Sequence, residues 1–173
     1  MDKFDKALPP NLSLSEENIK KAKLIHEKAR YMRGRMLNSV AVIENHTAII
    51  ITRYFCQNQN LKRNLFYELI IEKLSLEKKA NILKKIVETD YLEFKDNFKH
   101  LTKIKQIIPF RNILAHSTLD FSEEILSRPI DEGISFSNWN ESKPITEKDF
   151  EDWQVKASDI ISDLKTFMEL LPK

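Results

Sequence analysis

Apolar residues recur at steps of three or four over residues 19–54, which is the spacing of one face of an α-helix. Ser13 or Ser15 can cap the start of this helix, and the two glutamates that follow suit its amino-terminal turn. The stripe keeps its phase through Gly34, so the pattern predicts one long helix to about Phe55 that can bend at the glycine. The stripe consists of Ile19, Ala22, Ile25, Ala29, Met32, Met36, Val40, Ile43, Ile50 and Tyr54.

Two further helices are predicted after a polar connection, NQNLKR, at residues 58–63. Apolar positions between Leu65 and Leu74 predict a short second helix. Ser75 can cap a third helix that extends to about Val87. We expect the lysines of this helix to lie on a solvated outer face that carries no site. These lysines are Lys78, Lys79, Lys84 and Lys85.

The carboxyl-terminal half combines two more helices with a short irregular stretch. Helical spacing from about Tyr91 continues through Pro109, which is expected to kink the helix, and reaches residues 111–116. Alternation in TLDF and GISFSNW then predicts a small hairpin or irregular excursion. Thr146 opens a variant capping box before a last amphipathic helix that Pro172 ends. The fold class predicted is all-α, a bundle of about five helices with a small insertion before the last one.

Composition agrees with one helical domain over residues 1–173, of which residues 1–12 form a polar leader. Only 2 of the 173 residues are glycine, which leaves little turn punctuation for an all-β protein. The formal net charge of +2 is too small to indicate a nucleic-acid partner by itself. Cys56 is the only cysteine, and no signal peptide or membrane-spanning run occurs, so we expect a soluble, cytoplasmic chain without a membrane partner.

Candidate chemistry is concentrated in PFRNILAHSTLDF, residues 109–121, where polar side chains interrupt an apolar helical pattern. Asn112 and His116 lie one helical turn apart and share a face. Arg111 points about 140° away from His116, so its long side chain must wrap back to meet it. Histidine titrates near neutral pH and arginine offers a bidentate fork to phosphate, which suits cleavage of RNA without a metal.

A structural explanation of the same residues stays open. A histidine near the carboxyl end of a helix is favoured there by the helix dipole, and Arg111 can pair with a surface carboxylate. Glu44, between apolar runs of the first helix, is a further candidate that can face inward and lie behind the motif. The alternative is an exposed Glu44 with His46 at the surface. No Gly-rich phosphate loop, H-E-x-x-H or G-x-S-x-G motif occurs, so no cofactor and no metal are expected.

The stretch RNILAHS, Arg111 to Ser117, resembles the signature of the HEPN superfamily, the higher eukaryotes and prokaryotes nucleotide-binding domain. The order of helices around it is similar as well. The resemblance implies a metal-independent endoribonuclease of toxin or phage-defence type, which acts on RNA as a homodimer with both motifs lining one cleft. Arg111, Asn112 and His116 would be its catalytic residues, and Glu44 a residue behind them.

One departure from the family concerns partners. A subgroup that is paired with a nucleotidyltransferase antitoxin has a tyrosine two residues after the histidine, where this chain has Thr118. An antitoxin protein stays a candidate partner, although the chain lacks the tyrosine that is typical of this subgroup. The alternative from a different class is a non-catalytic helical module that binds RNA, a nucleotide or a protein partner, in which the same three residues serve structure.

Overall fold

The computed structural model of the chain describes residues 15–57, 60–95, 101–138 and 141–171. Helices dominate these residues, and the strands form only one small sheet, which confirms the predicted all-α class. The chain divides into two compact units, Met1–Met36 with Asn112–Asp152 (unit 1) and Leu37–Arg111 with Trp153–Lys173 (unit 2). The single domain and the polar leader stay predictions, and the leader lies outside the described residues.

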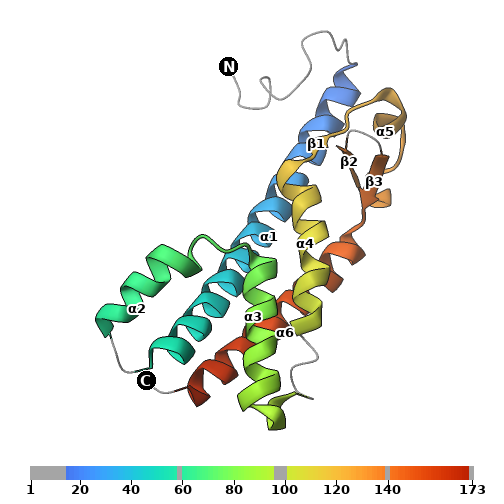
Figure 1. Cartoon of the computed structure of the whole chain (residues 1–173). Helices are drawn as coiled ribbons and strands as arrows, with labels where there is room; N and C mark the ends of the chain where they lie inside the picture. The colour runs from blue at the N-terminus through green and yellow to red at the C-terminus, as the bar shows by residue number, and fades with distance from the viewer. Residues whose placement is uncertain (1–14, 58–59, 96–100, 139–140, 172–173) are drawn as a thin grey trace. The chain divides into compact units, whose positions relative to one another are not determined.

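Unit 1 contains the small sheet and the ends of three longer helices (Figure 1). Its elements are the first part of α1 (Glu16–Cys56), the end of α4 (Leu101–His116), β1 (Thr118–Leu119), α5 (Glu123–Ser127), η4 (Ile130–Glu132), β2 (Ile134–Asn138), β3 (Glu141–Ile145) and the start of α6 (Glu147–Leu170). The sheet is antiparallel with the order β1-β2-β3. Leu119 of β1 pairs with Phe136 of β2. Ile134 of β2 pairs with Ile145 of β3, and both of these isoleucines are buried.

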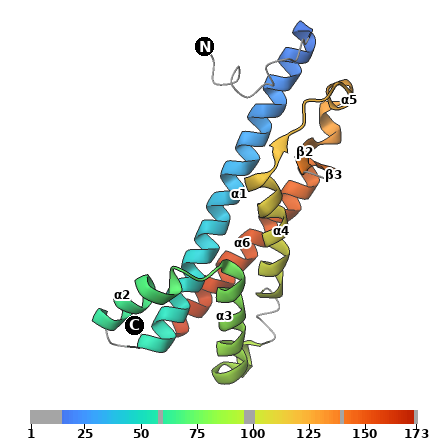
Figure 2. The same ribbon diagram turned by 45° about the horizontal axis from the view of Figure 1, so that its top comes forward.

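Unit 2 is built from the second part of α1, α2 (Asn60–Phe66), the π-helical turn η1 (Tyr67–Ile71), α3 (Leu76–Asp90), η2 (Leu92–Phe94) and parts of α4 and α6. The last helix presents the apolar stripe that its spacing predicts. Its buried members are Phe150, Trp153, Ala157, Ile160, Leu164 and Phe167, with Leu171 just beyond it. In Figure 1 and in the turned view of Figure 2, α2 lies beside the end of α1, on the side away from α3.

Three predicted helix starts are confirmed by their hydrogen bonds. Ser15 Oγ accepts from the backbone N–H of Asn18 at 3.2 Å. Ser75 Oγ accepts from the N–H of Lys78 at 3.4 Å and caps α3. In the capping box before α6, Asp149 N–H donates to Thr146 Oγ1 at 3.1 Å and Thr146 N–H donates back to Asp149 Oδ2 at 3.0 Å. Each cap satisfies amide groups that the helix itself leaves unpaired.

Several predicted boundaries and one predicted surface are wrong. The second helix begins at Asn60, inside the stretch assigned to a polar connection. The fourth helix was predicted from about Tyr91, but a 3-10 turn occupies Leu92–Phe94, and α4 as described begins at Leu101. Its continuation through Pro109 to His116 is as predicted, and the kink at Pro109 stays a prediction. Lys79 is 4% exposed, not solvated, because its ammonium pairs with a carboxylate on α1.

No helix within the described ranges is both long enough and apolar enough to cross a membrane.

Replacing each of the two glycines by alanine is expected to have opposite effects on the stability of the fold. Gly34 is exposed within α1 and a Cβ there meets nothing within 4 Å, so Gly34→Ala is expected to stabilise the fold by about 1 kcal/mol. Gly133 has φ +112°, and a Cβ there lies 2.7 Å from the carbonyl oxygen of Ile145. Gly133→Ala is therefore expected to cost about 2 kcal/mol. Urea unfolding of both variants tests this, and a neutral Gly133→Ala contradicts the backbone assignment.

Candidate functional site

The three motif residues lie in the last turns of α4. Asn112 and His116 are exposed, and both belong to unit 1. Arg111 precedes Asn112 on the same helix and is half-buried. It is the last residue of the segment Leu37–Arg111 of unit 2. His116 is the final residue of the helix. The helix thus carries an exposed imidazole at its carboxyl end, with an exposed amide one turn before it.

The end of α4 is fixed in place by packing and by hydrogen bonds. Leu114 is fully buried and anchors this turn. The N–H of Ser117 donates to the carbonyl of Ile113 at 3.0 Å, which extends the helical bonding one residue past His116. Ser117 itself is 5% exposed, and its carbonyl oxygen accepts a 2.5 Å hydrogen bond from Arg33 Nη2 on α1. The backbone that carries His116 is therefore restrained on both sides.

Arg33 is a candidate that sequence reasoning missed. Its guanidinium lies 5.1 Å from the centre of the Phe136 ring, an arrangement in which a cation faces an aromatic ring. Burial lowers the pKa of Arg33 from its usual value, yet a guanidinium stays charged at neutral pH. Its Nε is buried without a hydrogen-bond partner among the described residues. The charged side chain of Arg33 is therefore partly shielded from water and fixed against the backbone of Ser117, the residue that follows His116.

The sequence signal for this region is RYMRGR, residues 30–35, which places three arginines and a tyrosine within six residues of α1. Arg30 and Arg35 are exposed and line a shallow hollow together with Glu27 and Tyr31. The Tyr31 side chain is 60% exposed. Its ring packs edge-on against Phe150, with 6.1 Å between the ring centres. An exposed aromatic ring flanked by arginines suits a single-stranded nucleic acid.

The other candidates on α1 lie in unit 2. Glu44 Oε1 is 2.7 Å from the ammonium of Lys79 on α3. This ion pair gives Glu44 a structural partner, and its predicted role behind the motif stays a prediction. His46 is half-buried, and the pKa of its imidazole is lowered by burial and by the charge of Lys165. Both effects favour the neutral form of the His46 imidazole.

Potential metal ligands are scattered. In the part of the chain that the structure describes, no three side chains of His, Cys, Asp or Glu are grouped as a metal ion would need.

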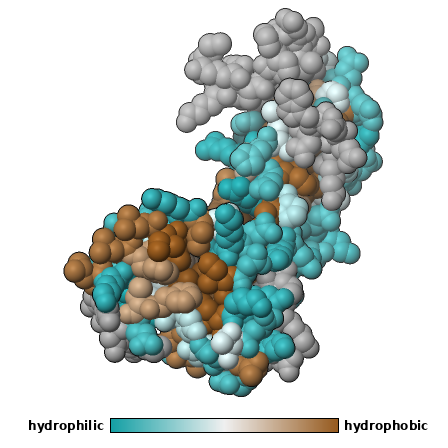
Figure 3. All heavy atoms as spheres, in the orientation of Figure 1, coloured by the Kyte–Doolittle hydropathy of each residue, from teal (hydrophilic) through white to brown (hydrophobic). Residues whose placement is uncertain are grey.

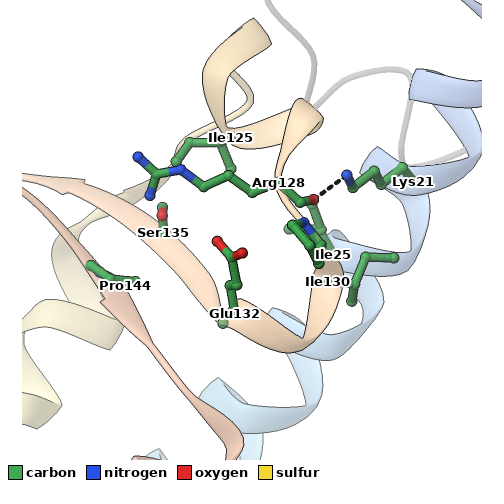
Figure 4. Close-up of a pocket in the computed structure, with 10 residues that line it drawn as sticks. Lys21, Ile25, Ile125, Arg128, Ile130, Glu132, Ser135 and Pro144 are labelled. Carbon is green, nitrogen blue, oxygen red and sulfur yellow. Dashed lines mark hydrogen bonds between the residues drawn. The ribbon is translucent and has the colours of Figure 1, made fainter.

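A separate cavity of about 250 Å³ lies in unit 1 between α1, α5 and β2 (Figure 4). Lys21 closes one side by donating to the carbonyl oxygens of Leu126, at 2.5 Å, and Arg128. Glu132 and Ser135 line the opposite wall, and Ser135 is 3% exposed. The lysine thereby joins the backbone of the α5 segment to α1, and none of the motif residues lines this cavity.

No protein-family model matches the chain, and neither the curated proteins nor the solved structures contain a match to it.

Proposed function

We propose that the chain is a metal-independent endoribonuclease of HEPN-like type, in a toxin or phage-defence role. The observation that carries the proposal is the placement of Arg111, Asn112 and His116 on the last turns of α4, with His116 exposed at its end. Arg33 supports the proposal, because it provides a fixed cation next to that end.

In the proposed reaction a ribose 2′-oxygen attacks the adjacent phosphorus, and the 5′-oxygen of the next nucleotide leaves. His116 removes the 2′-hydroxyl proton or protonates the leaving oxygen. Arg111 stabilises the negative charge that develops on the phosphorane oxygens. Asn112 orients either partner by hydrogen bonds. The products are a 2′,3′-cyclic phosphate and a 5′-hydroxyl, so atoms and charge balance without a metal.

One chain supplies a single His116, whereas the reaction uses both an acid and a base. A homodimer would place two motifs at one cleft and supply both groups. RNA is the proposed substrate, an antitoxin protein a candidate partner, and the cytoplasm the proposed location, which suits a chain with one cysteine.

A substrate with a blocked nucleophile tests the proposed reaction. A short RNA that is cleaved at one position is compared with the same RNA carrying a single 2′-deoxynucleotide on the 5′ side of that position. Cleavage there is expected to stop, while cleavage at other positions continues, because only the missing hydroxyl can attack. Cleavage of the deoxy position at an unchanged rate, or products with a 5′-phosphate, would exclude this chemistry.

The surface around Tyr31 predicts a measurable contribution to RNA binding. Replacing Arg30 and Arg35 by glutamine removes two cations, so the negative slope of log binding constant against log salt is expected to become shallower by about 1.4 for a single-stranded RNA. Lys20→Gln with Lys23→Gln removes the same charge elsewhere on α1 and is the matched control. Equal slopes for the two double variants would show that the arginines contact no phosphate.

The alternative function is a non-catalytic module that binds RNA, a nucleotide or a protein. The position of His116 as the last residue of α4 favours it, because a helix dipole stabilises a cation there. Under this alternative His116→Ala lowers the free energy of unfolding by about 0.5 to 1 kcal/mol. The wild type then has no RNA cleavage activity that the substitution could remove. Urea unfolding and a turnover assay on the same preparation separate the two functions.

A further inference from the structure

Two features of the described residues take no part in the proposed reaction. One is the outer side of α2 in unit 2, where Leu61 is 77% exposed and Leu65 50% exposed, and where apolar side chains gather in Figure 3. Apolar exposure marks an interaction surface but does not by itself select the partner. The other is the cavity of about 250 Å³ in unit 1, which is lined by apolar, polar and charged side chains. These groups specify the chemistry of a ligand.

The hydroxyl of Ser135 is the polar group that points most directly to a ligand. Ser135 lies on β2 and is 3% exposed. Its side chain lines the cavity, and Figure 4 shows the hydroxyl directed into it. Among the residues that the structure describes, this hydroxyl has no hydrogen-bond partner. A buried hydroxyl without a partner costs free energy, and a ligand that presents a hydrogen-bond acceptor to it would remove that cost.

Charged groups of opposite sign line the same space. The guanidinium of Arg128 donates through Nη2 to Glu124, and its fork has further N–H groups that can bind an anion. Glu132 is exposed, and its carboxylate has no ion pair within the described ranges. The ammonium of Lys21 is already held by the carbonyl oxygens of Leu126 and Arg128. Arg128 is therefore suited to an anionic group of a ligand and Glu132 to a cationic group.

The rest of the wall and the volume of the cavity limit the ligand further. Aliphatic side chains form much of the wall, namely Ile25, Ile125, Ile130, Pro129 and Pro144. A cavity of about 150 Å³ accommodates benzene, so a volume of about 250 Å³ suits a molecule of roughly ten non-hydrogen atoms. A nucleotide is about twice this size. Glu132 and Pro144 are exposed at the edge of the cavity, which gives a small ligand access from solvent.

We infer that this cavity binds an aliphatic α-amino acid in its zwitterionic form. The carboxylate of the ligand accepts hydrogen bonds from the Arg128 guanidinium and the Ser135 hydroxyl. Its ammonium pairs with the Glu132 carboxylate, and its alkyl side chain packs against the isoleucines of the wall. An inorganic anion would leave Glu132 unpaired and would gain nothing from the apolar wall. The inference rests on unit 1 alone and does not depend on the ribonuclease proposal.

Calorimetric titration of the full chain tests the inference. The probes are leucine, isoleucine, valine and methionine, and at least one is expected to bind with a dissociation constant of about 1 mM or lower. Isocaproate lacks the ammonium of leucine, and isoamylamine lacks its carboxylate. Each of these analogues is expected to bind at least about 10-fold more weakly than leucine, because one charged contact is lost. Absence of binding by all four amino acids, or isocaproate binding as tightly as leucine, overturns the inference.

Two variants of the cavity locate the bound amino acid. Ser135→Ala and Glu132→Gln remove groups without a partner among the described residues, so both are expected to fold normally. Each is expected to raise the dissociation constant of leucine about 10-fold. Glu151→Gln removes the same charge from an exposed position on α6 outside the cavity, and is expected to bind leucine like the wild type.

The isocaproate comparison assigns the ammonium to its partner. In Glu132→Gln, leucine and isocaproate are expected to bind about equally, because the carboxylate that distinguishes them is gone. Wild-type affinity for leucine in both cavity variants would place the amino acid elsewhere and contradict the inference. Leucine binding by a chain that cleaves no RNA would contradict the proposed function and leave this inference standing.

Discussion

Replacing His116 by alanine is expected to lower the rate of RNA cleavage by about 10² to 10⁴-fold, because it removes the group to which we assign the proton transfer. Arg111→Ala is expected to lower the rate by about 10² to 10³-fold, through lost stabilisation of phosphorane charge. Initial rates at substrate saturation measure both effects. His26→Ala, a half-buried histidine of α1, is the control and is expected to keep the wild-type rate.

Mixing the two inactive variants tests whether the site is shared between copies. If the arginine and the histidine of one site come from different chains, a mixed dimer of Arg111→Ala and His116→Ala contains one intact site. Partial recovery of cleavage is then expected after the two proteins are mixed. A mixture as inactive as its components would show that each site belongs to one chain, and would leave the motif assignment in place.

The second large effect is on stability and concerns the pair between Glu44 and Lys79. The lysine is 4% exposed, whereas the glutamate is 40% exposed. Glu44→Ala leaves a buried ammonium without its carboxylate 2.7 Å away, and is expected to lower the free energy of unfolding by about 3 kcal/mol. Lys79→Met keeps the buried stem and leaves a carboxylate that reaches water, so a loss below about 1 kcal/mol is expected.

Urea unfolding of these variants checks the asymmetry. Glu88→Ala removes a carboxylate from the outer face of α3, where both lysine partners lie at 3.6 Å, and serves as the control. Its expected cost is below about 1 kcal/mol, as for other exposed pairs. Equal losses for Glu44→Ala and Glu88→Ala would contradict the buried pair. A loss of cleavage by Glu44→Ala at full stability would instead support its predicted role behind the motif.

The fold was predictable where periodicity and local capping decide it. The stripe of α6, from Phe150 to Leu164, is buried as its spacing predicts, since burial of an amphipathic helix follows from its own sequence. The caps at Ser75 and Thr146 depend on residues three positions away, and they too are confirmed. The small insertion before α6 was expected as a hairpin or irregular excursion, and it forms three strands with the short helix α5.

The errors arise where a contact between distant segments decides the outcome. Lys79 shares a lysine-rich helix with exposed neighbours, and only Glu44, 35 residues earlier, explains its burial. Arg33 looks like one of several surface cations of α1, and its contact with Ser117 spans 84 residues. The leucines of α2 follow a helical pattern that does not reveal whether the apolar side meets the same chain or another one. Sequence periodicity indicates which face of a helix is apolar, but not which surface that face packs against.

The most direct test of the proposed function is a single comparison of RNA cleavage in excess chelator. Purified wild type and His116→Ala are incubated side by side with a single-stranded RNA, and the ends of the products are identified. The account predicts that wild type cleaves the RNA and leaves 2′,3′-cyclic phosphate ends, while His116→Ala does not. Absence of cleavage by wild type, or equal cleavage by the two proteins, would contradict it.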